Sequence, residues 1–200
     1  MLLSFKQCNP LDFVQKGGYE THLDIGGSVG TVMLVMLDGS NEIFRDVILA
    51  AIVDLAAEGK TITDIRYKGK NTRRWFQMVF PAALSPVFFG ILDRHNSLMG
   101  YLVVNQSSLS AARKVLGIAL VKSCRGLGIG YRVFKHVQEN LDKMFQPRIT
   151  ELVFDTTRDN MPMMAIARKL GFKEEALPKN NAWGDLPSDR VRFLWTKPGT

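Results

Sequence analysis

The feature that most constrains this chain is a group of three glycines between an apolar run and a helix-like segment. Residues 115–121 form the apolar run, Arg-Gly-Leu-Gly-Ile-Gly occupies residues 125–130, and apolar side chains at helical spacing follow. Glycines between a strand and a helix let the backbone turn tightly and leave several N–H groups pointing to one place, beside the positive end of the helix dipole. A turn of this kind binds phosphate.

The spacing of these glycines excludes two common phosphate-binding motifs. A P-loop ends in Gly-Lys-Ser/Thr, whereas this turn ends in Gly-Ile-Gly-Tyr, and a dinucleotide fingerprint places its third glycine one residue later. The turn instead resembles the pyrophosphate loop of the GNAT superfamily of acyl-CoA-dependent N-acyltransferases. That loop reads Arg or Gln, two residues, Gly, one residue, and Gly or Ala, which Arg125, Gly128 and Gly130 fit.

A second stretch extends the resemblance. A strand-like run at 149–156 is followed by Asn160 and then by Lys-Leu-Gly-Phe at 169–172, similar to the strand, asparagine, short helix and "K-L-G-F" of the family. The likeness covers residues 115–196. The part of the chain before it matches the family only in the order of its elements.

The expected fold is of the α/β (α+β) class, a GNAT-like mixed and mostly antiparallel central sheet flanked by helices. A chain of 200 residues with 46% hydrophobic composition is expected to form one domain, with residues 1–30 as an N-terminal extension that is loop with at most one strand. Residues 115–196 are its acyl-CoA-binding and C-terminal part. The expected strands are 31–37, 86–93, 98–105, 113–121, 149–156, 172–176 and 190–196, and the expected helices are 41–58, 129–144 and 160–170.

The resemblance implies a site for acetyl-CoA or another acyl-CoA as co-substrate. Main-chain groups near Ile118 and Leu120 would pair with the pantetheine amides as an added strand does, and an N–H near Leu120 would bond the developing oxyanion. Asn160 would bridge to the ligand or act as a helix N-cap. The implied CoA-binding residues are Ile118, Leu120, Arg125, Gly126, Leu127, Gly128, Ile129, Gly130 and Asn160.

The groups that would transfer protons are not defined by the sequence. Many family members place a tyrosine four residues before the glycine of "G-F", where it protonates the leaving thiolate, and this chain has Ala167 there. Residues 115–121 contain no carboxylate or histidine, although some members place a general base in this run. Asp155, Thr156 and Tyr101 are catalytic candidates by proximity in the expected sheet.

Cysteine and histidine give no further site. A structural thiol is the preferred interpretation of Cys124, because no histidine partner is adjacent to it in sequence. His136 falls among the polar positions of its helix, which favours a solvated side chain over a catalytic one. Two cysteines and three scattered histidines are too few for a disulfide framework, and no metal site is expected.

The expected function is transfer of an acyl group, acetyl in the first instance, to a primary amine by direct attack on the thioester. The acceptor is a small molecule, a protein or an aminoacylated tRNA. The alternative is a non-catalytic CoA-binding or RNA-binding protein with the same fold. A basic stretch at 60–74 is interpreted as a solvated loop in preference to an RNA surface by about two to one, and the net charge of +7 fits either function.

The chain is expected to be a cytoplasmic protein that does not associate with membranes. Its N-terminal apolar run is too short for a signal peptide, and no uncharged apolar run reaches the length of a membrane span. A homodimer is compatible with the sequence.

Overall fold

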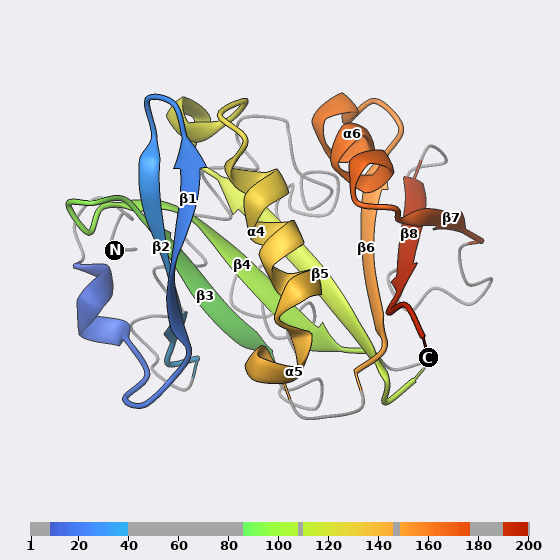
Figure 1. Ribbon diagram of the computed structural model, residues 1–200, viewed down its shortest axis with the longest axis horizontal. Helices are drawn as coiled ribbons and strands as arrows, with labels where there is room; N and C mark the ends of the chain where they lie inside the picture. Colours follow the sequence, from blue (N-terminus) through green and yellow to red (C-terminus); the bar gives the residue numbers. More distant parts are fainter. Residues whose placement is uncertain (1–8, 40–85, 108–109, 146–148, 177–189, 200) are drawn as a thin grey trace, which may run out of the picture.

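The computed structural model describes residues 9–39, 86–107, 110–145, 149–176 and 190–199 (Figure 1). The expected helix at 41–58 and the basic stretch at 60–74 lie outside these residues. The described elements, in chain order, are η1 (Pro10–Phe13), β1 (Glu20–Gly26), β2 (Gly30–Leu37), β3 (Val87–Leu92), β4 (Leu98–Gln106), β5 (Arg113–Leu120), η3 (Lys122–Cys124), α4 (Ile129–Glu139), α5 (Leu141–Met144), β6 (Glu151–Thr157), α6 (Met161–Lys169), β7 (Lys173–Glu175) and β8 (Arg190–Thr196).

The eight strands form one sheet in the order β1-β2-β3-β4-β5-β6-β8-β7. The β5–β6 pair is parallel, and the other neighbouring strands pair antiparallel. The expected mixed, mostly antiparallel sheet is therefore confirmed. No helix among the described residues is long and apolar enough to cross a membrane.

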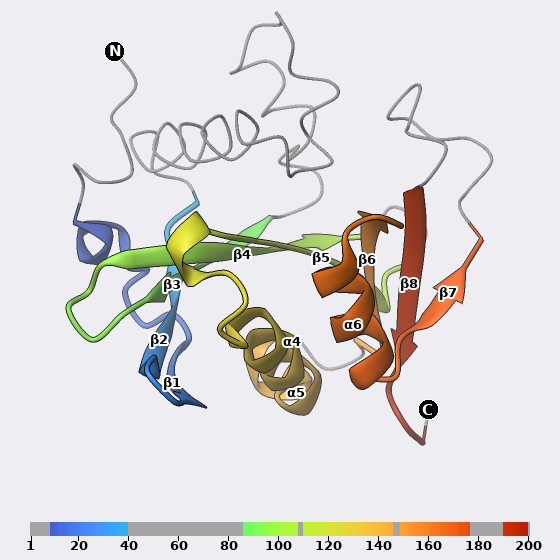
Figure 2. The same cartoon turned by 90° about the horizontal axis from the view of Figure 1, so that it is seen from above.

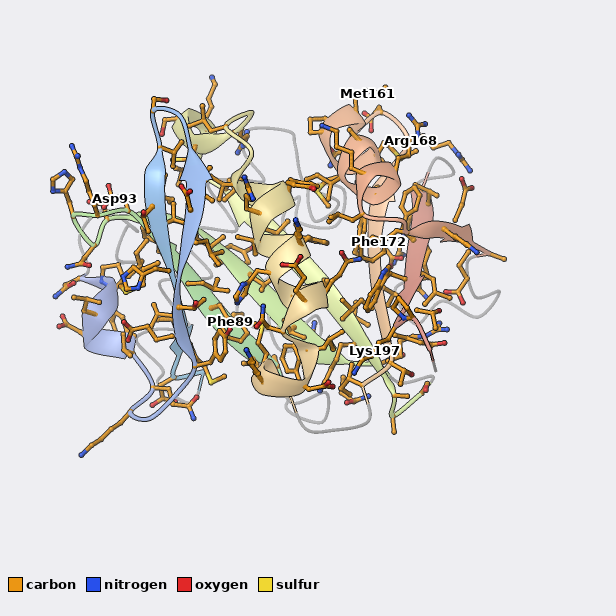
Figure 3. All side chains as sticks on the ribbon, viewed as in Figure 1. Phe89, Asp93, Met161, Arg168, Phe172 and Lys197 are labelled. Atoms are coloured by element: carbon orange, nitrogen blue, oxygen red, sulfur yellow. The ribbon has the colours of Figure 1, made fainter. Side chains whose placement is uncertain are left out.

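The helices α4 and α6 cover one face of the sheet, which holds the main core cluster (Figure 2). The side chain of Phe154 on β6 lies at the centre of this cluster. Its ring centroid is 5.3 Å from that of Phe134 on α4, 5.1 Å from that of Phe172 and 5.4 Å from that of Phe193 on β8. Figure 3 shows Phe172 near α6 and β8, so this aromatic contact fixes α6 against the sheet.

The N-terminal region contains the one strand that the sequence allows there. β1 pairs with β2 over residues 20–26, so the expected extension contributes an edge strand to the sheet. The turn between the two strands places Gly26, Gly27 and Gly30 at positive φ. These glycines, which favour a loop interpretation, form the tight connection of a hairpin.

The expected helix at 129–144 is interrupted at Asn140. Its φ and ψ are −122° and 22°, and its side-chain amide donates to the carbonyl of His136 at 3.1 Å. A side chain that bonds the backbone one turn earlier competes with the helical ladder. The segment therefore divides into α4 and the short helix α5.

Candidate functional site

The strands β5 and β6 pair over only three residues. Their ladder runs from Arg113↔Glu151 to Val115↔Val153 and no further. β5 continues to pair with β4 up to Gly100↔Leu120. Figure 1 shows β5 and β6 side by side at one end and apart at the other, where α4 begins. Among the described residues, the second half of β5 therefore has a partner strand on one edge alone.

The main-chain groups of Ile118 and Leu120 face the opened edge of β5. Val121 N–H donates to the Met99 carbonyl, and Ser107 N–H donates to the Arg113 carbonyl, so odd-numbered residues of β5 bond to β4. Because main-chain direction alternates along an antiparallel strand, the even-numbered residues point the other way. This geometry allows an extended ligand to add to β5 as a strand would, as the sequence predicts for pantetheine.

The turn after β5 leads into the N-terminus of α4. Gly126 and Gly128 have φ of 77° and 82°, a left-handed conformation in which only glycine is unstrained. Gly128 is the N-cap of α4, makes no side-chain cap hydrogen bond, and is followed by a first turn without acidic residues. The first N–H groups of α4 have no partner within the helix, and the dipole adds positive potential. The arrangement is suited to an anion.

The third glycine has a different role from the first two. Gly130 is buried, and a Cβ at this position would lie 3.3 Å from Cδ1 of Ile166 on α6. A Cβ at Gly128 would meet no atom within 4 Å. Gly130 therefore permits close packing of α4 on α6, whereas Gly126 and Gly128 shape the exposed turn.

Arg125 joins the turn to the strand. Its Nε donates to the carbonyl of Leu120 at 3.0 Å, and the side chain is half-buried. The arginine expected to contact a ligand phosphate thus also fixes the end of β5. Two exposed apolar side chains lie at the end of the sheet where β5 and β6 separate. Leu127 is 41% exposed, and Met161, at the start of α6, is 62% exposed (Figure 3).

Asn160 occupies the position expected of a helix cap. Its Oδ1 accepts a hydrogen bond from the N–H of Met163 at 3.4 Å at the start of α6. Ala167 lies further along this helix and is fully buried in the core cluster. The side chain that stands where the family has its tyrosine is therefore packed against other apolar groups.

Asp155 is held between two arginines of β8. Arg192 donates to it from Nε at 2.7 Å and from Nη2 at 2.9 Å, and Arg190 donates to it from Nη2. The hydrogen bond to Asp155 raises the pKa of Arg192. With both oxygens already accepting hydrogen bonds, Asp155 is better placed to organise β6 and β8 than to accept a proton from a substrate.

The other two catalytic candidates are buried on opposite faces of the sheet. Burial raises the pKa of Tyr101, so its hydroxyl remains protonated. The hydroxyl of Thr156 is buried on the face that Phe154 shares with α6, and no group among the described residues hydrogen-bonds to it. The structure does not bring Tyr101, Thr156 and Asp155 to one point.

The expectation that the side chain of His136 is solvated is wrong, and the sequence did not single out Arg190. His136 is half-buried, with its Nε2 2.7 Å from the hydroxyl of Tyr19 on the N-terminal side of β1 and its Nδ1 3.2 Å from the amide nitrogen of Asn140. Burial lowers the pKa of His136. Both side chains depend on contacts more than 30 residues apart, for which the local pattern carries no signal.

No three His, Cys, Asp or Glu side chains in the described part of the chain are grouped as metal ligands.

The chain is similar in sequence to a known family and in structure to several solved proteins. The model of the acetyltransferase (GNAT) family matches residues 49–172. No curated protein matches the chain.

Several solved structures share the fold. A proposed acetyltransferase from Acinetobacter baylyi ADP1 superimposes with a TM-score of 0.58 at 16% identity, covering 82% of this chain and 92% of that one. The microcin C7 self-immunity acetyltransferase MccE, in complex with acetyl-CoA and AMP, gives 0.57 at 16% identity, with 82% and 92% covered. Spermidine N-acetyltransferase from Vibrio cholerae, in complex with CoA and spermine, gives 0.54 at 14% identity, with 83% and 95% covered.

Proposed function

The chain belongs to the GNAT acetyltransferase family, and we propose that it transfers an acyl group, acetyl in the first instance, from coenzyme A to a primary amine. The observation that carries this proposal is the opened edge of β5, which leads directly into the bare N-terminus of α4. Coenzyme A has two chemical parts that fit this arrangement. The strand edge can pair with the amides of its pantetheine arm, and the helix N-terminus can bind its pyrophosphate. The structures of MccE with acetyl-CoA and of the spermidine enzyme with CoA support this substrate.

In the proposed complex, the pyrophosphate lies against the N–H groups of residues 126–131, and the pantetheine arm extends along β5. Ile118 offers both its N–H and its carbonyl to the arm. Leu120 does not hold the arm, because its carbonyl already accepts from Arg125 and its N–H is left for the reacting carbonyl. The thioester then lies beside the end of β5, where the N–H of Leu120 bonds the oxyanion that forms on attack.

The reaction we propose needs no covalent enzyme intermediate. The neutral amine attacks the thioester carbonyl, the tetrahedral intermediate collapses, and the thiolate of CoA leaves. Holding the two reactants together supplies much of the acceleration. Water is the proposed proton carrier, because Asp155 is occupied by two arginines, the Tyr101 hydroxyl is buried, and Ala167 carries no acid.

The absence of an acid at Ala167 also supports a second candidate function, a protein that binds CoA without catalysis. A thermal melt with acetyl-CoA, with RNA and with neither separates binding functions. A ligand at 100 times its dissociation constant stabilises by about 2.7 kcal/mol. Stabilisation by RNA alone would contradict the acyltransferase proposal.

An acceptor screen separates catalysis from binding. Thiol released from acetyl-CoA is followed with small-molecule amines, including spermidine, with amine-bearing peptides and with aminoacylated tRNA. We expect release that depends on one class of amine, together with an acylated product of matching mass. Binding of acetyl-CoA without release in any mixture would favour the non-catalytic function.

A further inference from the structure

The side chain of Arg190 is buried but only partly used. It is 6% exposed, and its Nη2 donates to Oδ2 of Asp155. Its Nε and Nη1 are buried without a hydrogen-bond partner in the described part of the chain. A buried guanidinium with unmet donors is costly, because the donors lose water and gain nothing in return. An incoming acceptor atom would remove that cost.

Asp155 does not need Arg190 for its own neutralisation. Arg192 bonds both oxygens of this carboxylate, one from Nε and one from Nη2. This two-point contact is the strong form of an arginine–carboxylate pair. Arg190 therefore supplies a second positive charge to a carboxylate that already has one.

The charged side chains on this face of the sheet form one network. Arg113 contacts Glu151 at 2.7 Å and Glu175 at 3.1 Å. Asp155 contacts Arg190 and Arg192, and Glu175 is the cross-strand partner of Arg192. The three arginines and three carboxylates therefore balance in charge, and Arg190 is the member that lies beyond the last β5–β6 ladder pair, beside the part of β6 from which β5 has separated.

The side chain of Arg190 and the helix α4 that follows the glycine turn lie on opposite faces of the sheet. Phe154 and Phe193 pair across β6 and β8 and belong to the core under α4 and α6. Asp155 and Arg192 are the next pair along, so their side chains, like that of Arg190, project from the other face. A substrate held by the N-terminus of α4 leaves this second face to the reaction partner.

We propose that Arg190 binds an anionic group carried by the amine acceptor, through the Nε and Nη1 donors, which have no partner among the residues that the structure describes. The proposal rests on the proposed acyltransferase function and narrows its acceptor. The acceptor is an amine with a carboxylate or phosphate close to the nitrogen, such as an amino acid or an aminoalkyl phosphate. A polyamine is disfavoured, since the guanidinium of Arg190 would repel its further ammonium groups.

The test compares matched amines by initial rates of thiol release from acetyl-CoA. Phenylalanine is paired with its amide and with phenethylamine, and phosphoethanolamine with ethanolamine, which separates carboxylate from phosphate. Spermidine is the cationic arm. We expect kcat/KM to be at least about tenfold higher for an anionic member than for its neutral partner, equivalent to about 1.4 kcal/mol. Thermal melts of the acetyl-CoA complex with the same amines report binding independently of turnover.

Arg190→Gln should abolish that preference while acetyl-CoA binding and turnover of neutral amines stay unchanged. Asp155 keeps its two-point contact with Arg192 in this variant. The matched control is Arg158→Gln, which removes an exposed arginine paired with Glu174 on the neighbouring β7. It should leave the preference intact.

Equal or better turnover of neutral or cationic amines by the wild type would overturn the inference and leave the acyltransferase function standing. Equal losses for anionic and neutral amines in Arg190→Gln would overturn it as well. So would a panel in which no anionic amine is acylated or stabilises the complex. If Arg190→Gln does not fold, the wild-type comparison decides alone. Failure of acetyl-CoA to bind at all contradicts the proposed function itself.

Discussion

Replacement of Gly128 is the sharpest test of the glycine turn. Its φ of 82° is strained for a residue with a Cβ, and a Cβ there meets no atom within 4 Å. Steric clash therefore contributes nothing, and the cost to folding is the left-handed conformation alone, about 1 kcal/mol. Asn and Asp tolerate this conformation better than other side chains. Gly128→Asn and Gly128→Asp should both fold and differ by one charge.

That charge decides affinity for coenzyme A. A carboxylate about 4 Å from a phosphate charge costs about 4 kcal/mol at the effective dielectric of a protein surface. Each 1.36 kcal/mol is a factor of ten, so Gly128→Asp should bind CoA roughly a thousandfold more weakly than Gly128→Asn. The assay is calorimetric titration with CoA, and urea denaturation checks that both variants are folded. Equal affinities in two folded variants would refute the assignment of this turn.

Three further predictions concern Arg125, Ala167 and His136. Arg125→Ala should weaken CoA binding less than Gly128→Asp in calorimetry, because one charge-assisted contact is lost while the main-chain N–H groups remain. Ala167→Tyr should lower the free energy of unfolding by about 1–3 kcal/mol, since a phenol would overpack a fully buried position; faster thiol release in a fully stable variant would contradict this. Burial lowers the pKa of His136, so as the pH falls the unfolded chain is protonated at this histidine before the folded chain, and the free energy of unfolding should fall below about pH 6.5. Thermal melts at falling pH should show a smaller loss of stability for His136→Gln than for wild type. The control His22→Gln, which changes an exposed histidine, should lose as much stability as wild type.

Sequence patterns predicted the elements that depend on neighbouring residues. The run before the glycine turn, the turn itself and the apolar stripe of α4 are local signals, and all three are in place. The strands β3 and β4, which pair antiparallel, were predicted for the same reason, because each is an apolar run and a short polar segment separates them. β1 is the one strand that the sequence allowed within residues 1–30, but its bounds were not predicted because its weak alternation lies among glycines that also favour loops.

The roles of individual side chains were harder to predict. Gly130 fits the family motif, yet it is buried against Ile166, a contact that only the packing of two helices creates. A substitution of Gly130 would therefore disturb that packing as well as the turn, so Gly128 is the cleaner probe. Asp155 was a catalytic candidate by position, and its two arginine partners are 35 and 37 residues away. Such contacts are fixed by strand register, which the sequence alone does not define.

Amide hydrogen exchange with and without acetyl-CoA tests the central claim most directly. The N–H groups of Ile118 and Leu120 face an edge to which no described strand pairs, and those of residues 129–131 lack partners within α4. These amides should exchange fast in the free protein and become protected on binding. The N–H of Val121, which already donates to Met99, should change little. Protection that appears elsewhere and leaves Ile118, Leu120 and the start of α4 unchanged would contradict the account.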